Sequence, residues 1–279
     1  MATDPAHDLA LRICVERGYS LIRECGAGTF KRTFQVQQGA EDFALKLIVN
    51  ASDAERVRRE VDALTSCDHP SISRLIDVGI YVNGATQVVY IVEGYLSGGT
   101  LTEKIDGWKT LARDEVVVLG GQLIGAISHL QARNLVHRDV KPDNIMFDSG
   151  GVGVLLDLGI ARHLDASSLT ATWLAMGPGT PAFAPPEQLL NEKHLIDWRC
   201  DQFSLGITLG LAALGIHAYT GQSDFAGVTD LVGRRSNLHP NFVRAAQNSN
   251  LFPLVTMVDP WPIRRFSRPD VLARAWNSI

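Results

Sequence analysis

The pattern of apolar residues changes along this chain of 279 residues, and the change limits the folds that it can adopt. Over Tyr19–Leu47 and Leu75–Val92 the apolar residues occur in short strand-like runs separated by glycine and polar residues. After Gly98 they recur at helical spacing, most clearly over Asp114–Ala132 and Phe203–Ala218. The sequence therefore predicts an α+β fold with a small β-rich N-terminal part and a larger helical C-terminal part.

Two short helices and a hairpin are expected within the N-terminal part. Apolar residues recur at helical spacing over residues 8–17 and, among many charged residues, over 54–67. The strand-like runs at 75–82 and 87–92 flank an Asn-Gly pair at 83–84, which is a strong signal for a tight hairpin turn.

Composition and charge argue against several classes of function. The net charge is −4 and no basic stripe is present, so a nucleic-acid partner is not expected. No charged start precedes an apolar core at the N-terminus, and the longest apolar stretch is interrupted, so neither a signal peptide nor a membrane span is expected. The four cysteines are widely scattered, which argues against a zinc site or a disulfide framework and favours a cytoplasmic protein.

The segment most informative about function is His137–Asn144, which reads H-R-D-V-K-P-D-N. It resembles the catalytic loop of protein kinases, H-R-D-x-K-x-x-N. A polar loop between a helix and a strand is the alternative interpretation, but a chance match to the whole string is improbable. The resemblance implies the two-lobed protein kinase fold and Mg²⁺-dependent transfer of the γ-phosphoryl group of ATP to a hydroxyl group.

Four residues are expected to carry this chemistry. By the resemblance, Asp139 accepts the proton of the hydroxyl, and Lys141 neutralises charge on the phosphate. Asn144 is expected to hold a magnesium ion. Asp157 begins a D-L-G sequence that resembles the family's D-F-G motif, and it is the second expected magnesium ligand.

A partial glycine-rich loop lies near the N-terminus. The sequence Gly26-Ala27-Gly28 follows a predicted strand and partly matches G-x-G-x-x-G, the loop that covers the phosphates of ATP. Glycine lets backbone N–H groups approach phosphate oxygens closely. Lys31 replaces the third glycine, and the sequence leaves its role open between a phosphate contact and an exposed side chain.

The sequence A-L-K at positions 44–46 resembles the V-A-I-K motif. The resemblance implies that Ala44 packs on the adenine and that Lys46 holds the α- and β-phosphates. A carboxylate is expected to position this lysine, with Glu60 as the first candidate and Glu55 as the second. An exposed helix glutamate paired with a neighbouring arginine is the alternative interpretation of Glu60.

The two lobes are expected to join at Gly94–Gly98, with an N-terminal lobe over residues 1–93 and a C-terminal lobe over 99–279. The sequence departs from the family at this junction. Glu93 stands where an apolar residue is usual, and Gly94 stands where a glutamate is usual. Adenine is read there by backbone groups, so ATP binding is still expected; a shift of the alignment by one residue is the alternative.

Three residues are expected to hold the fold together. The segment Gly179–Glu187 reads G-T-P-A-F-A-P-P-E and resembles the end of a kinase activation segment, with P-P-E in place of A-P-E. The resemblance implies an ion pair between Glu187 and an arginine near the C-terminus, for which Arg268 is the candidate. Asp201 opens an apolar helix and resembles the aspartate that braces the catalytic loop.

The motifs favour serine or threonine as the accepting residue of a protein substrate. Lys141 lies within the catalytic loop, and Gly179-Thr180 precedes the P-P-E sequence. By resemblance, Thr180 contacts Asp139 and Lys141 and shapes the hydroxyl site. Tyrosine kinases usually carry a different loop sequence.

Control by phosphorylation is a further hypothesis. An arginine at position 138, beside Asp139, can pair with a phosphate on the activation loop. Thr170 and Thr172 resemble the T-x-T phosphosites of bacterial receptor-type serine/threonine kinases, and we expect autophosphorylation there. Incidental threonines in a polar loop, with Arg138 serving the structure alone, are the alternative.

Two other functions compete with a serine/threonine kinase of bacterial type. A catalytically impaired pseudokinase, acting as a nucleotide-binding scaffold, would explain the altered glycine loop and junction. Against it stand the four residues expected to be essential, Lys46, Asp139, Asn144 and Asp157. A small-molecule kinase of the aminoglycoside type would share the two lobes but would typically lack the activation segment and the arginine–lysine pattern.

Overall fold

The computed structural model describes residues 4–27, 31–48, 61–83, 86–158, 162–163, 180–223 and 225–279. The chain divides into two compact units. The N-terminal unit comprises residues 1–68, 73–97 and 157–159, and the C-terminal unit comprises residues 69–72, 98–156 and 160–279. A sheet dominates the first unit and helices dominate the second, so the predicted α+β fold class is confirmed.

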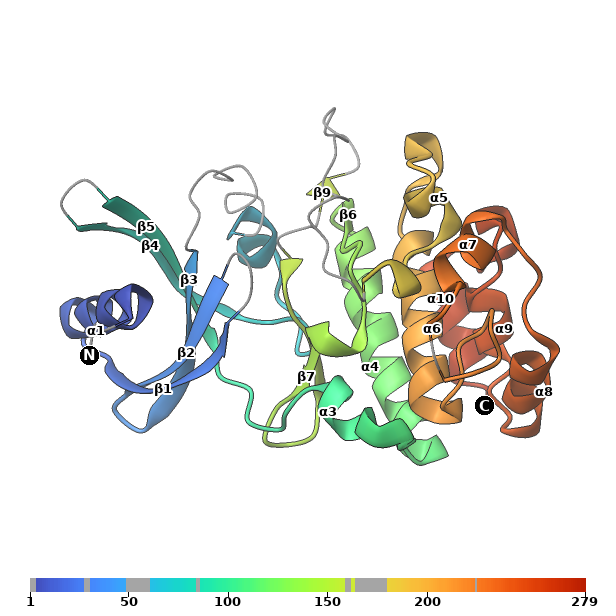
Figure 1. The fold of residues 1–279 in the computed structure, drawn as a ribbon, viewed down its shortest axis with the longest axis horizontal. Coiled ribbons are helices and arrows are strands. Elements are labelled where there is room, and N and C mark those ends of the chain that lie inside the picture. The colour runs from blue at the N-terminus through green and yellow to red at the C-terminus, as the bar shows by residue number, and fades with distance from the viewer. Residues whose placement is uncertain are drawn as a thin grey trace. The chain divides into compact units, whose positions relative to one another are not determined.

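The N-terminal unit is a five-stranded antiparallel sheet with a helix packed on one face (Figure 1). The strand order is β1-β2-β3-β5-β4. In chain order the elements are α1 (Pro5–Arg17), β1 (Ser20–Ala27), β2 (Lys31–Gln38), β3 (Glu41–Ile48), a helical segment over residues 61–66, β4 (Leu75–Asn83) and β5 (Thr86–Gly94).

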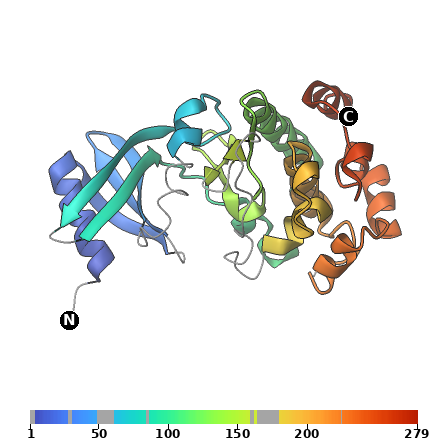
Figure 2. The same ribbon diagram turned by 90° about the horizontal axis from the view of Figure 1, so that it is seen from above.

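Local sequence determines where α1 begins and ends. The Asp4 carboxylate accepts the N–H of Ala6 at 3.1 Å, and Pro5 occupies the first helical position. Gly18 ends the helix in the left-handed conformation, with φ of 74°. Figure 2 shows α1 lying across the sheet. Its buried residues pack with alternate side chains of three strands, namely Phe34, Val36, Leu45, Leu47, Val88, Tyr90 and Val92.

Strand alternation places a second set of side chains on the opposite face of the sheet. Because Leu45 packs with α1, its neighbours Ala44 and Lys46 in β3 face away from that helix. Lys46 is paired in register with Ile91 of β5, and Ala44 is paired with Glu93. Glu93 is therefore a diagonal cross-strand neighbour of Lys46, within reach of its long side chain.

The C-terminal unit is built around α4 (Arg113–Gln131) and α6 (Arg199–Leu214), which pack against each other. Helix α6 is buried along nearly its whole length. The other helices are α3 (Leu101–Ile105), α5 (Pro186–Leu189), α7 (Val228–Gly233), α8 (Pro240–Asn248), α9 (Pro253–Met257) and α10 (Pro269–Trp276). No helix within the described ranges is both long enough and apolar enough to cross a membrane.

Short strands and 3₁₀ turns complete this unit. The strands are β6 (Leu135–Val136), β7 (Ile145–Phe147), β8 (Gly153–Leu155) and β9 (Arg162–His163). They form two small antiparallel sheets, β6-β9 and β7-β8. The turns are η2 (Asp106–Trp108), η3 (Pro142–Asn144), η6 (Thr180–Phe183), η7 (Lys193–Leu195) and η8 (Pro262–Arg264).

A glycine lets α10 approach α4 closely. A Cβ at Gly120 would lie 2.1 Å from the indole ring of Trp276, which is far inside contact distance. The buried indole N–H donates to the carbonyl of Val117 at 2.9 Å. The last helix of the chain is thereby anchored to the central helix of its unit.

A buried histidine connects η6 with the loop that follows α6. His217 Nδ1 accepts the N–H of Tyr219 at 3.2 Å, so Nε2 carries the proton and donates to the Ala182 carbonyl at 3.0 Å. The neutral imidazole makes both of these hydrogen bonds. Burial lowers the pKa of His217 to about 4.

The lowered pKa of His217 predicts that the free energy of unfolding decreases as the pH falls from about 6.5 to about 4. The unfolded chain binds a proton near the ordinary pKa of 6.5, whereas the folded chain binds it only near 4, so acid favours unfolding. The full loss is about 3 kcal/mol. Urea titrations at several pH values should show a shallower pH dependence for His217→Gln. Identical pH dependence in both proteins would contradict the assignment.

Candidate active site

Two lysines and two carboxylates come together in the N-terminal unit, on the side of the sheet away from α1. We call Lys31, Lys46, Glu93 and Asp157 the lysine–carboxylate cluster. Lys46 Nζ lies 2.9 Å from the Glu93 carboxylate and 3.2 Å from Asp157 Oδ1. Lys31 Nζ lies 2.9 Å from the same Asp157 oxygen. The Lys46 and Glu93 side chains are only 7% and 2% exposed, so water screens their ion pair little.

Asp157 has an unusual backbone conformation and an ionised side chain. Its φ of 61° lies in the left-handed region, which aspartate adopts more readily than most residues. Burial opposes ionisation of the carboxylate, but the Lys31 and Lys46 ammonium groups outweigh it and hold the pKa of Asp157 well below its usual range. An ionised carboxylate is the kind of hard oxygen ligand that Mg²⁺ prefers.

The loop between β6 and β7 arranges a second set of polar groups, in the C-terminal unit. Lys141 Nζ lies 3.0 Å from Asp139 Oδ2. Asn144 Nδ2 donates to the same carboxylate oxygen at 2.9 Å and to the Asp139 carbonyl at 2.8 Å. A cation and an amide therefore fix the carboxylate expected to act as general base. Because Asn144 turns its Nδ2 toward Asp139, its amide oxygen is the atom suited to a metal ion.

Asp201, in the first turn of α6, holds this loop in place. Its two carboxylate oxygens accept the N–H groups of His137 and Arg138, each at 2.8 Å. Burial raises the pKa of Asp201, and the two N–H donors partly offset that effect. Arg138 has φ of 70°, and the Gln188 amide donates to its carbonyl at 2.8 Å. The loop conformation is thus stabilised at both sides of the strained residue.

His137 contributes to the shape of the loop rather than to proton transfer. Its Nδ1 accepts the N–H of Asp139 at 3.2 Å, so Nε2 is the protonated nitrogen. That nitrogen lies 2.8 Å from the Leu156 carbonyl, to which it donates. Both ring nitrogens are engaged by the backbone.

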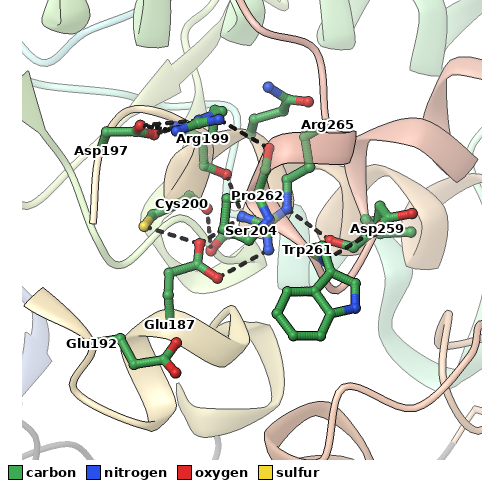
Figure 3. Close-up of polar contacts among 12 residues, drawn as sticks. Glu187, Glu192, Asp197, Arg199, Cys200, Ser204, Asp259, Trp261, Pro262 and Arg265 are labelled. Carbon is green, nitrogen blue, oxygen red and sulfur yellow. Dashed lines mark hydrogen bonds and ion pairs between the residues drawn. The ribbon is translucent and has the colours of Figure 1, made fainter. Parts of the chain in front are cut away.

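The arginine that pairs with Glu187 is Arg265, and the prediction of Arg268 was wrong. Arg265 Nη1 and Nη2 lie 2.6 and 3.0 Å from the two Glu187 carboxylate oxygens, and both side chains are fully buried (Figure 3). The Arg265 Nε also donates to the Asp259 carbonyl at 2.8 Å, which directs the guanidinium inward. Arg268, at the N-terminus of α10, is exposed and pairs with Asp270 at 3.1 Å.

Further contacts complete the environment of this buried pair. Arg265 Nη1 donates to the Arg199 carbonyl at 2.9 Å, and its guanidinium lies 4.7 Å from the Phe203 ring centroid. The Cys200 thiol donates to Glu187 Oε1 at 3.3 Å. Charge, hydrogen bonds and packing are all satisfied, as a fully buried ion pair requires.

Several predicted site residues have no described side chain. The residues outside the described ranges are Gly28, Glu55, Glu60, Thr170 and Thr172. Thr180 begins η6, but its side chain is not described. The roles expected of these residues therefore stay predictions.

The other nucleotide-binding candidates lie in β1 and β3 of the N-terminal unit, on either side of β2. Gly26 and Ala27 end β1, and Gly26 is paired in register with Thr33 of β2. Ala44, partly buried, lies in β3. No described group of three or more His, Cys, Asp or Glu side chains is arranged to hold a metal ion. The expected donors, an amide oxygen at Asn144 and a carboxylate at Asp157, fit Mg²⁺ by their chemistry.

Four contacts of the lysine–carboxylate cluster were not predicted from the sequence. These are the ion pair of Lys46 with Glu93, the hydrogen bond of Ser73 to Glu93, and the ion pairs of Lys31 and Lys46 with Asp157. A signal for the first was present, since Glu93 is an acid within an apolar run. Nothing in the sequence distinguished Ser73 from an ordinary loop serine.

The α+β fold and an Asp–Lys–Asn loop braced by a helix are the features expected of a protein kinase domain. The family described as protein kinase domain matches residues 19–276. The chain therefore belongs to the protein kinase family.

Relatives occur in eukaryotes and bacteria, so the comparison does not favour a bacterial type. The ovarian-specific serine/threonine-protein kinase Lok of Drosophila melanogaster is 26% identical, over 98% of this chain and 59% of that protein. CBL-interacting serine/threonine-protein kinase 26 of Arabidopsis thaliana is 27% identical, over 92% and 58%. The probable serine/threonine-protein kinase PknB of Bifidobacterium longum is 34% identical, over 61% and 25%. The chain thus spans less than two thirds of the length of these relatives.

The ion pair of Glu187 with Arg265 predicts very different effects for two arginine substitutions. Arg265→Ala leaves Glu187 buried without its cation and should lower the free energy of unfolding by about 3–5 kcal/mol. Arg268→Ala, at an exposed position, should change it by less than about 0.5 kcal/mol. Urea unfolding of the two variants and the wild type measures the difference. Similar losses for both variants would contradict the assignment of Arg265.

Proposed function

We propose that this domain is a serine/threonine protein kinase that uses ATP and Mg²⁺. The observation that supports this most directly is the geometry of Asp139, whose carboxylate lies 3.0 Å from Lys141 Nζ and accepts the Asn144 amide at 2.9 Å. A general base and a neighbouring cation are the protein groups that phosphoryl transfer to a hydroxyl requires.

The residues of the loop then have distinct tasks. Asp139 orients the substrate hydroxyl and takes its proton as the oxygen attacks the γ-phosphorus and the bond from that phosphorus to the leaving ADP oxygen breaks. Lys141 offsets negative charge on the transferring phosphoryl group. Asn144 and Asp157 are the residues that would hold Mg²⁺, which when bound neutralises charge on the phosphate oxygens.

In the N-terminal unit, Lys46 and Lys31 supply positive charge for the nucleotide phosphates. Both ammonium groups lie within 3.2 Å of Asp157 Oδ1, so they are already directed to one point. Gly26 and Ala27 provide backbone at the end of β1, and Ala44 provides an apolar surface for the adenine. This set of groups is what binding of a nucleoside triphosphate needs.

The proposed substrate class is a protein with serine or threonine hydroxyl groups. The relatives carry the name serine/threonine-protein kinase, and Lys141 in the loop is the residue type that favours serine or threonine over tyrosine. Thr180, by its position before the P-P-E sequence, is proposed to line the hydroxyl site. A protein hydroxyl is therefore the proposed acceptor.

One observation favours a pseudokinase as the second candidate. Two ammonium groups contact the Asp157 oxygen that would otherwise be available to a metal ion. If that arrangement persisted with nucleotide bound, the domain would bind ATP without transferring phosphate. The experiment below separates the two functions.

Incubation with γ-labelled ATP and Mg²⁺ tests the proposal. Wild-type protein should label itself or a generic protein acceptor on serine or threonine. Asp139→Asn should lower the rate by about 10²–10⁴-fold, because the general base is lost while the shape of the side chain is kept. Thermal unfolding of both proteins controls for folding. ATP binding without any labelling would favour the pseudokinase.

Regulation by the activation segment is a separate part of the proposal. We expect autophosphorylation at Thr170 or Thr172, with Arg138 as a phosphate partner. Mass spectrometry of wild-type protein after reaction with ATP should find phosphate at one of these threonines, and the Thr170→Ala/Thr172→Ala variant should have lower activity. Unchanged activity in that variant would rule out this form of control.

A further inference from the structure

Glu93 is an acidic residue in the interior of the sheet. It lies near the end of β5, which is bordered by β3 on one side and by β4 on the other. The residue is 1% exposed. Burying a carboxylate is costly unless it is paired and hydrogen-bonded, so its partners explain its presence.

Two donors satisfy this carboxylate. The Lys46 ammonium lies 2.9 Å from it, and the Ser73 hydroxyl donates to Glu93 Oε2 at 2.5 Å. Ser73 is itself buried and comes just before β4. The serine and the lysine therefore hold the carboxylate between them.

Backbone pairing with two neighbouring strands also fixes the position of Glu93. It is paired in register with Ala44 on one side and with Leu75 on the other. A strand paired on both sides cannot shift without breaking two ladders of hydrogen bonds. A carboxylate placed there has a fixed position whenever the sheet is folded, whereas one on a separate helix depends on where that helix lies.

We propose that Glu93 is the positioning residue that sets the Lys46 ammonium for the phosphates of ATP. This inference rests on the proposed function and adds a residue that the kinase motifs do not include. Lys46 is held from within its own sheet, by a diagonal neighbour in the adjacent strand. The role predicted for Glu60 is a separate matter, because Glu93 acts on Lys46 whether or not a second carboxylate contributes.

A purely structural role for Glu93 is the competing explanation, and nucleotide binding distinguishes the two. Titration with the β,γ-imido analogue of ATP plus Mg²⁺ probes the phosphates, and titration with adenosine probes the base and sugar alone. Glu93→Gln keeps the size of the side chain and an acceptor but removes the charge. The Kd for the ATP analogue should rise about ten- to hundredfold, while the Kd for adenosine stays unchanged.

A matched control comes from the same sheet. Asp77 of β4 accepts the N–H of Val78 at 2.8 Å and the hydroxyl of Tyr90 at 3.4 Å, and Tyr90 belongs to the face of the sheet that packs with α1, opposite the face of Lys46. Asp77→Asn should leave both Kd values unchanged. If Glu93→Gln does not fold, Ser73→Ala keeps the ion pair but removes the hydroxyl donor, and it should give the same pattern with a smaller, several-fold effect.

The outcomes separate this inference from the proposed function. Three results for Glu93→Gln would overturn the positioning role. These are an equal rise of the Kd for both ligands, a lower binding stoichiometry at unchanged Kd, and no change at all. Wild-type protein that binds the analogue but transfers no phosphate would overturn the kinase activity, and the ratio of Kd values would still decide the role of Glu93. Wild-type protein that does not bind the analogue would overturn both.

Discussion

The arrangement of the catalytic loop depends on one buried carboxylate. Asp201 receives two consecutive backbone N–H groups, those of His137 and Arg138, and the second of these residues has a positive φ. A non-glycine residue in that conformation costs of order 1 kcal/mol or more, so it persists only where its surroundings over-determine it. With Asp201 on α6, the most buried helix of its unit, the rigid core of the domain is connected directly to the backbone beside Asp139.

Buried charge is used in two ways in this chain. Glu187 and Arg265 are fully enclosed, and all three guanidinium nitrogens of Arg265 donate hydrogen bonds. Such a pair adds little net stability compared with apolar residues of the same size, but it penalises any packing that separates the two charges. The Lys46–Glu93 pair is equally buried, yet its lysine also contacts the partly exposed Asp157. The first pair joins α5 to the residue that follows η8, and the second joins β3 to β5 beside Asp157.

Much of this organisation was predictable, because the motifs depend on local sequence. The motif at 137–144 suggested the roles expected of Asp139, Lys141 and Asn144. The hydrophobic pattern located α4, α6, β4 and β5, and it indicated strand structure over residues 19–47 without dividing it into β1, β2 and β3. The sequence could not show which of two similar arginines, both far along the chain from Glu187, forms the ion pair with it. Arg265 and Arg268 are three positions apart, and contacts that depend on the fold, such as the bond from Arg265 Nε to the Asp259 carbonyl, determine which one points inward.

The role of Glu93 also could not be recognised from the sequence alone. An acid in an apolar strand looked like a departure from the family or a shifted alignment, because strand register is invisible until the partner strand is known. Once Ala44 and Glu93 are paired, the acid must share a face with Lys46, and the departure becomes an ion pair. A lysine whose partner lies in the same sheet is positioned as soon as the sheet forms. The sheet therefore places the Lys46 ammonium group beside Glu93, where it also contacts Asp157.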